Sequence, residues 1–179
     1  MPEIHIRPAK AADLLPLSAL DHSYASDHVW QLDPAVEDGL IQVGLRRVQL
    51  PRAIPVAYPR PLGQLTEDWL ERSGMLTALL DDQLVGYAGM QFGFPPEDIW
   101  LMDLVVASPL RRQGIGSALM VAALEWSRQH NGRYLMLALQ HKNHPGIELA
   151  RKFGFEFCGY NDRYYANHDI ALFFARSAR

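Results

Sequence analysis

The sequence predicts an α/β domain in which an antiparallel first part leads into a strand–helix–strand unit. Two observations support this fold class. Residues 75–93 form two apolar runs joined by the acidic pair Asp81-Asp82, which is the pattern of a β-hairpin. Residues 99–107 form an almost continuous apolar run, and a helical pattern follows it. Such a run is typical of a central strand that is buried on both faces.

Length and charge limit the classes of protein to which the chain can belong. Its 179 residues suit one domain, residues 1–179, with a substantial core. A net charge of −3 argues against a dedicated nucleic-acid binder, which would carry a basic surplus. No stretch approaches the roughly 18 apolar residues of a membrane span, and no apolar signal segment is visible. The single cysteine, Cys158, excludes an internal disulfide. We therefore expect a cytoplasmic protein with no membrane or nucleic-acid partner.

The first third of the chain has little clear pattern. Residues 3–7 alternate apolar and polar side chains and predict a short strand that Pro8 ends. A weak helix is expected over residues 14–20, where leucines line one side. Residues 21–62 are rich in proline, so we expect irregular, partly extended chain with one short strand at 46–50. A further helix is expected over residues 64–72.

The second half has a regular pattern. Apolar residues recur with helical spacing from Ile115 to Trp126, and Gly132 lies where that helix should end. We then expect a strand over 134–140 and a helix over 145–153. Two more strands are expected, from Gly154 towards Tyr160 and over 170–175.

The junction between the buried strand and its helix carries the first chemical motif, LRRQGIGSAL at residues 110–119. Glycines at a helix N-terminus let an anion approach backbone N–H groups that have no partner within the helix. A dinucleotide fingerprint would need a small residue at Leu119, and a Walker A loop would need a lysine before Ser117. Both alternatives fail, which leaves a plain tight turn or another phosphate ligand.

A second motif distinguishes these two alternatives. Arg111-x-x-Gly114-x-Gly116, together with the later segment Asn143…Gly154-Phe155, resembles the R/Q-x-x-G-x-G/A and N…GF motifs of the GNAT N-acetyltransferases. Parts of the chain look similar to the streptothricin acetyltransferase-like branch. The resemblance implies the α/β GNAT fold, with a central mixed sheet of about six to seven strands flanked by about four helices.

The resemblance also implies acetyl-CoA as cosubstrate and a place for each part of it. The pyrophosphate would lie on the backbone of residues 113–117 beside two arginines. The pantetheine arm would lie between two splayed strands, with Asn143 as an anchor. The N–H near Val105 would polarise the thioester carbonyl. The implied binding residues are Leu104, Val105, Val106, Arg111, Arg112, Gln113, Gly114, Ile115, Gly116, Ser117 and Asn143.

The catalytic acid is the point at which the chain departs from the family. Many relatives carry a tyrosine at the position of Ala150, and alanine cannot donate a proton. Tyr164 or Tyr165 could reach the thioester sulphur, and Asp103 could accept a proton through water. A loop clamp for the tyrosines and a hydrogen-bonded strand residue for Asp103 remain equal alternatives. His141 and His144 lie three residues apart, but we expect solvated histidines and no metal.

Together these observations predict an acetyl-CoA-dependent N-acetyltransferase that acts on a primary amine of a small, cationic molecule. Acetylation of a protein N-terminus or lysine remains an alternative. The loss of the tyrosine also leaves open a non-catalytic acyl-CoA-binding sensor or partner subunit. Relatives are often dimers, so a homodimer is the partner that the resemblance offers.

Overall fold

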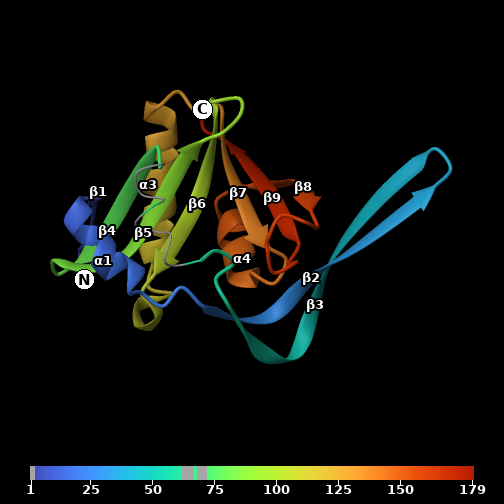
Figure 1. Cartoon of the computed structure of the whole chain (residues 1–179), viewed down its shortest axis with the longest axis horizontal. Coiled ribbons are helices and arrows are strands. Elements are labelled where there is room, and N and C mark those ends of the chain that lie inside the picture. Colours follow the sequence, from blue (N-terminus) through green and yellow to red (C-terminus); the bar gives the residue numbers. More distant parts are fainter. Residues whose placement is uncertain (1–2, 62–66, 68–71) are drawn as a thin grey trace.

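The structure is a computed structural model that describes residues 3–61, 67 and 72–179. Its main feature is a seven-stranded mixed sheet in the order β1-β4-β5-β6-β7-β9-β8 (Figure 1). The strands are β1 (Ile4–Pro8), β4 (Gly74–Leu80), β5 (Gln83–Phe92), β6 (Asp98–Val106), β7 (Tyr134–Gln140), β8 (Glu156–Asn161) and β9 (Ala171–Ser177). These bounds confirm the mixed α/β class and the strands expected from residue 75 onward.

The sheet is antiparallel except at its centre. β4 and β5 form the expected hairpin, and Asp81 and Asp82 both adopt positive φ, 48° and 61°, in its two-residue turn. β6 and β7 run parallel, as the helical crossover between them requires. β6 therefore lies in the middle of the sheet, with neighbours on both edges.

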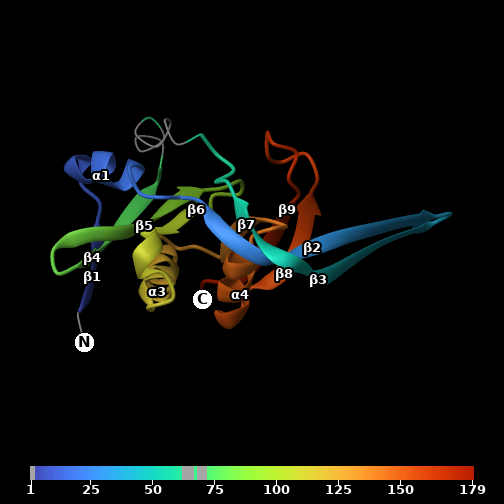
Figure 2. The same cartoon turned by 90° about the horizontal axis from the view of Figure 1, so that it is seen from below.

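Three α-helices are present in the described part of the chain, where the sequence suggested about four. They are α1 (Leu14–Ser18), α3 (Ile115–Gln129) and α4 (His144–Lys152), with short 3-10 turns at Ala11–Asp13 and Ser108–Leu110. Figure 2 shows α3 and α4 on one face of the sheet and α1 on the other. The helix expected over residues 64–72 lies mostly outside the described residues. None of the described helices is long and apolar enough to cross a bilayer.

The core follows from this layering. One large apolar cluster fills the space between the sheet and the face covered by α3 and α4, with Ile99, Leu119 and Ile147 fully buried. A smaller cluster lies under α1 and contains Leu17 and Tyr87. The apolar face of α3, from Ile115 onward, is therefore the crossover face that the sequence predicted.

The prediction of irregular chain over residues 21–62 is wrong. This segment forms a long two-stranded hairpin, β2 (Tyr24–Glu37) and β3 (Leu40–Val56), which projects from the body (Figure 1). Both faces of its outer part are exposed, so no apolar alternation marks it as a strand pair. Each strand of a two-stranded ribbon also has a free edge, which accommodates prolines such as Pro34 and Pro51. We refer to residues 31–47 as the arm.

Candidate functional site

The site begins where the two central strands separate. β6 and β7 pair only from Asp98 to Leu101 and from Tyr134 to Leu137. A bulge against β5 leaves Met102 as the extra residue in β6 and bends the strand at that point. Beyond it, the facing edges of residues 102–106 and 138–140 carry backbone groups that do not pair with each other. An extended ligand can therefore bind between them in the manner of an added strand.

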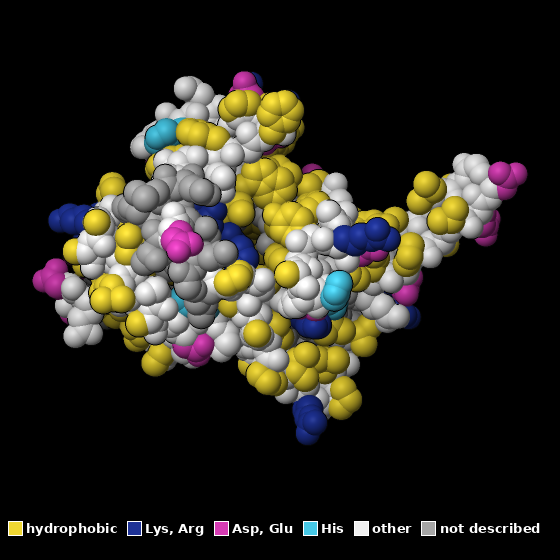
Figure 3. Space-filling view, viewed as in Figure 1, with side chains coloured by type: hydrophobic (Ala, Val, Ile, Leu, Met, Phe, Trp, Pro, Cys, Tyr) yellow, Lys and Arg dark blue, Asp and Glu magenta, His cyan; other side chains and the backbone are white. Residues whose placement is uncertain are grey.

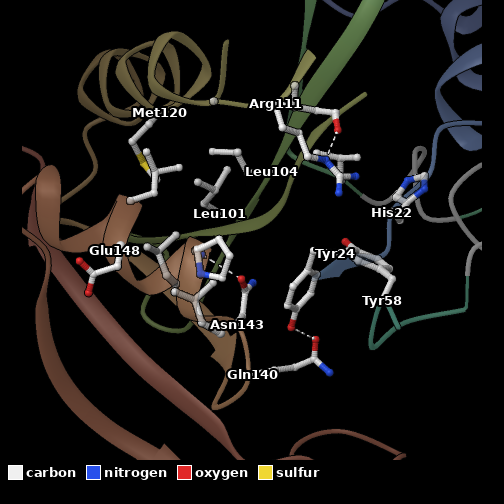
Figure 4. A pocket seen from close by; sticks show the side chains of 18 of the residues that line it. His22, Tyr24, Tyr58, Leu101, Leu104, Arg111, Met120, Gln140, Asn143 and Glu148 are labelled. Carbon is white, nitrogen blue, oxygen red and sulfur yellow. Dashed lines mark hydrogen bonds between the residues drawn. The ribbon is translucent and has the colours of Figure 1, made fainter. Parts of the chain in front are cut away.

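A cavity of about 580 Å³ occupies this opening and continues to the N-terminus of α3. Figure 4 shows apolar side chains such as Leu101, Leu104 and Met120 on one side, facing His22, Tyr24 and Tyr58 on the other. The volume lies within the range of about 300–1,000 Å³ that is common for small-molecule and cofactor sites.

The N-terminus of α3 has the backbone features of an anion-binding site. Its N-cap, Gly114, has φ of +92° and no side-chain cap, so the first N–H groups of the helix stay available. Arg112, two residues earlier, also has positive φ (65°), which folds the loop tightly. Lys152, from the last turn of α4, donates to Ser117 Oγ at 3.1 Å and adds a cation to this end of the cavity.

Nearly all of the implied acetyl-CoA-binding residues line this cavity. The exceptions are Gln113, whose amide nitrogen reaches the carbonyl of Pro109 at 3.3 Å, and Ile115, whose side chain is buried in the core. Those that line the cavity are Leu104, Val105, Val106, Arg111, Arg112, Gly114, Gly116, Ser117 and Asn143.

Arg111 makes contacts that its motif did not predict. Its guanidinium donates to the carbonyls of Val106 (2.8 Å), Ser23 (2.6 Å) and Asp21. These bonds fix the segment before β2 to the end of β6. Backbone carbonyls do not neutralise the guanidinium, so Arg111 still supplies positive charge to the cavity.

Asn143 is the N-cap of α4. Its Oδ1 accepts a hydrogen bond from the N–H of Gly146 at 2.9 Å, so its amide NH₂ is the group left to donate into the cavity. A Cβ at Gly146 would lie only 2.8 Å from the Asn143 amide, which explains the glycine there. The cap thus fixes the first turn of α4 against the cavity.

A polar network closes the far end of the cavity. The Tyr24 hydroxyl donates to Gln140 Oε1 at 2.8 Å, and Gln140 Nε2 donates to Asp169 at 2.7 Å (Figure 4 shows the first bond). Lys142 pairs with the other oxygen of Asp169. Burial acts to raise the pKa of Asp169, but the hydrogen bonds from Lys142 and Gln140 outweigh it, so that pKa lies below its usual value. Gln140 is buried, and its role had no signal in the sequence.

Asp103 lies behind the cavity wall and lines neither this cavity nor the smaller one that adjoins it. One carboxylate oxygen accepts from Tyr58 and from Arg60 (2.8 Å), and the other from Arg72 (3.1 Å). Burial acts to lower the pKa of the Arg60 guanidinium, but the negative charge of Asp103 has the larger effect, so that pKa is raised. Tyr58 and Arg60 come from a segment without a recognisable pattern, so no spacing or motif pointed to them.

The tyrosine candidates differ in placement. Tyr165 is buried, lines the cavity and donates to the carbonyl of Ala138 at 3.0 Å. Tyr164 is exposed to 41%, and its ring packs edge-on against Phe173. Ala150 is fully buried in the core and lines neither cavity. Burial raises the pKa values of Tyr165 and Tyr24 above the usual value of tyrosine.

A smaller cavity of about 190 Å³ adjoins the first and shares Arg60, Met102, Ala138 and Tyr165 with it. It opens beside the loop that carries Tyr164. A second molecule placed there would meet a ligand extended between β6 and β7.

Comparisons with known proteins agree with this geometry. Residues 45–155 match the acetyltransferase (GNAT) family. The streptothricin acetyltransferase of Streptomyces lavendulae is 27% identical over 164 residues, which cover 89% of this chain and 85% of that protein. The crystal structure of a nourseothricin acetyltransferase superposes with a TM-score of 0.83 at 25% identity, covering 98% and 99% of the two chains. The crystal structure of a Bacillus anthracis protein assigned as a streptothricin acetyltransferase, in complex with acetyl coenzyme A, superposes with a TM-score of 0.76 at 18% identity. The match covers 98% of this chain and 97% of that chain.

The family match spans more than half of the chain, and it includes both motifs and the strands that form the cavity. The resemblance drawn from the two motifs is therefore confirmed, and acetyl-CoA is the cosubstrate that the family uses. The chain belongs to the GNAT family and is an acetyl-CoA-dependent N-acetyltransferase.

Proposed function

We propose that the cavity binds acetyl-CoA and that the enzyme transfers its acetyl group to a primary amine of a small, cationic molecule of the streptothricin kind. The observation that carries this proposal is the continuity of the cavity, from the uncapped N-terminus of α3 to the unpaired edges of β6 and β7. The pyrophosphate lies on the N–H groups of residues 113–117, and the pantetheine follows residues 104–106. The N–H near Val105 polarises the thioester carbonyl.

The acceptor amine enters through the smaller cavity. Its volume of about 190 Å³ holds one arm of a molecule rather than a whole antibiotic. The aromatic rings of Tyr164 and Tyr165 line it and favour contact with a cationic group. The acidic residues at 33, 37 and 38 lie on the arm and line neither of these two cavities.

Arg60 assists the deprotonation of the amine. It lines both cavities, and its charge is balanced by Asp103, which Arg72 shares. Arg60 lines both cavities whereas Asp103 lies behind the wall, so a bound ammonium meets the guanidinium first, and a cation next to an ammonium lowers the pKa of that ammonium. In this proposal Asp103 positions Arg60 and Tyr58 and does not itself accept a proton from the amine.

A thiol-release assay with purified enzyme tests the acceptor. The enzyme should release CoA from acetyl-CoA when streptothricin is added as acceptor. It should not do so with a peptide that begins with alanine or with a peptide that contains lysine. CoA release only with a peptide would contradict the small-molecule acceptor. Failure of acetyl-CoA to bind would contradict the assigned cavity, and calorimetry of the enzyme with acetyl-CoA alone distinguishes these two failures.

Tyr165 lines both cavities, but its hydroxyl donates to the carbonyl of Ala138, so we infer a positioning role for it rather than that of the general acid. We expect Tyr165→Phe to lower kcat by less than about tenfold, because removing a general acid costs about 10²–10⁴-fold and a hydrogen bond much less. Tyr164→Phe is the matched control and should leave kcat unchanged. A hundredfold loss in Tyr165→Phe, with a changed pH profile, would establish it as the acid.

The same proposal includes a homodimer in the cytoplasm. The arm carries exposed Val36, Ile41 and Val43, and Figure 3 shows it standing clear of the body. A two-stranded hairpin is marginally stable alone in water, so contact with a second copy would stabilise it. The exposed free thiol of Cys158 suits a reducing compartment. Light scattering should give twice the chain mass, and Ile41→Asp should lower it; a monomeric wild-type chain would contradict the dimer.

A further inference from the structure

Three side chains that commonly ligate metals meet where β2 leaves the body. Asp27 and His28 lie at the bulge where the register of β2 against β3 shifts, between Ser26 and His28. His144 is the first residue of α4. The three therefore come from two elements that are far apart in the sequence, and the fold alone brings them together.

Their spacing suits one small ion. Asp27 Oδ1 lies 2.8 Å from His28 Nδ1, and the rings of His28 and His144 have centroids 4.5 Å apart. Each side chain offers one ligand atom, and these three atoms lie within 4.8 Å of one another. Ligand atoms that share a zinc ion at about 2.0–2.2 Å are about 3–3.5 Å apart, so small side-chain rotations complete the site.

His144 provides a second, independent observation. Its Nδ1 is buried and has no hydrogen-bond partner among the described residues, although buried polar atoms are usually paired. Glu148 Oε1 lies 4.0 Å from it, beyond hydrogen-bonding distance.

We propose that Asp27, His28 and His144 bind one divalent transition-metal ion of the zinc class. Two imidazoles and one carboxylate select zinc, copper or nickel over magnesium or calcium, which prefer oxygen ligands. Glu148 or water completes the coordination. This proposal departs from the absence of metal expected from the sequence, which considered His144 only with His141.

The ion would join the base of the hairpin to the first turn of α4. Asn143 precedes that turn and Glu148 lies one turn further along α4, and both side chains line the large cavity. The metal would therefore fix one wall of the cavity without contacting the thioester. The role is structural and does not depend on which amine is acetylated.

Calorimetry with ZnCl₂ tests the site in the full chain without an affinity tag. The Cys158→Ser background removes the exposed thiol as a competing ligand. We expect one zinc per chain, and His28→Gln and His144→Gln should each weaken binding at least tenfold. Asp27→Asn, which changes an exposed side chain, should weaken it less. His5→Gln, an exposed histidine on β1, is the matched control and should bind as the parent does.

Cobalt substitution gives a readout that a structural defect cannot imitate. Co²⁺ in the parent chain should produce visible absorption bands that both histidine variants lose, while circular dichroism shows that the variants stay folded. Absence of saturable zinc binding in the parent, or unchanged zinc binding in His28→Gln and His144→Gln, would overturn the proposal. Saturable Mg²⁺ binding that zinc does not displace would overturn the assigned metal class.

Discussion

Replacing Arg111 separates two roles that the motif alone merges. The resemblance implies that this arginine adds charge beside the pyrophosphate. In the structure its guanidinium also donates three hydrogen bonds to backbone carbonyls and so fixes the segment before β2 to the end of β6. Arg111→Ala should therefore lower both stability and acetyl-CoA affinity, whereas a purely ligand-binding residue would lower affinity alone.

The magnitude follows from the environment of each bond. The bond to Val106 is partly buried, and a hydrogen bond from a charged donor contributes about 1.5–3 kcal/mol. The bonds to Ser23 and Asp21 are exposed, so water replaces the donor and each contributes about 0.5 kcal/mol. We expect Arg111→Ala to lower the free energy of unfolding by about 2.5–4 kcal/mol in total. Arg111→Lys should recover less than half, because one ammonium cannot span three carbonyls.

Urea denaturation and the KM for acetyl-CoA measure the two effects together. Arg112→Ala is the matched control, because Arg112 is exposed and carries the same charge one residue away. It should raise KM by about 3–10-fold, less at high salt, with stability unchanged within about 0.5 kcal/mol. If Arg111→Ala raised KM but left the urea midpoint unchanged, the structural role of Arg111 would be refuted.

Three further predictions follow. Gly114→Ala should lower the free energy of unfolding by about 1 kcal/mol and raise the KM for acetyl-CoA, because φ at this position is +92°. Gly116→Ala should leave the free energy of unfolding unchanged, because the nearest atom to an added Cβ would lie at 3.6 Å. Urea denaturation compares the two variants. Asp103→Asn should destabilise by about 3 kcal/mol, because it removes the buried charge that Arg60 shares, and should lower kcat. The lowered pKa of Asp169 stabilises the fold above about pH 4, and this contribution is lost as pH falls further, so the stability difference between wild type and Asp169→Asn should shrink on acidification from pH 7 to pH 3.

The second half of the chain was predictable because its elements are buried. β6, β7 and α3 pack against each other, so their apolar residues follow the periods of strand and helix and mark the bounds within one or two residues. The glycine turn before α3 was predictable for a related reason. A glycine is needed there because the backbone at Gly114 adopts a positive φ, which other residues rarely adopt.

The hairpin and the contacts around Asp103 were not predictable in the same way. The outer part of β2 and β3 is exposed on both faces, so burial imposes no alternation on its sequence. Tyr58 and Arg60 approach Asp103 across more than forty positions of chain, and no local spacing encodes that contact. The role of Arg111 as a backbone clamp depends on where Ser23 lies, which also follows only from the fold.

The missing acid at Ala150 is best understood from the proton affinities of the groups that line the cavity. An alkyl thiol has a pKa of about 8.5 and an ordinary tyrosine about 10, and burial raises the pKa values of Tyr24 and Tyr165 further. From the ordinary values alone, proton transfer from a phenol to a departing CoA thiolate is uphill by about 2 kcal/mol. Both hydroxyl hydrogens are also already donated, that of Tyr24 to Gln140 and that of Tyr165 to the carbonyl of Ala138, but a thiolate is an adequate leaving group without an acid. We therefore propose that catalysis depends mainly on holding a deprotonated amine against the thioester, in the placement that the Arg60–Asp103 pair and the splayed strands supply.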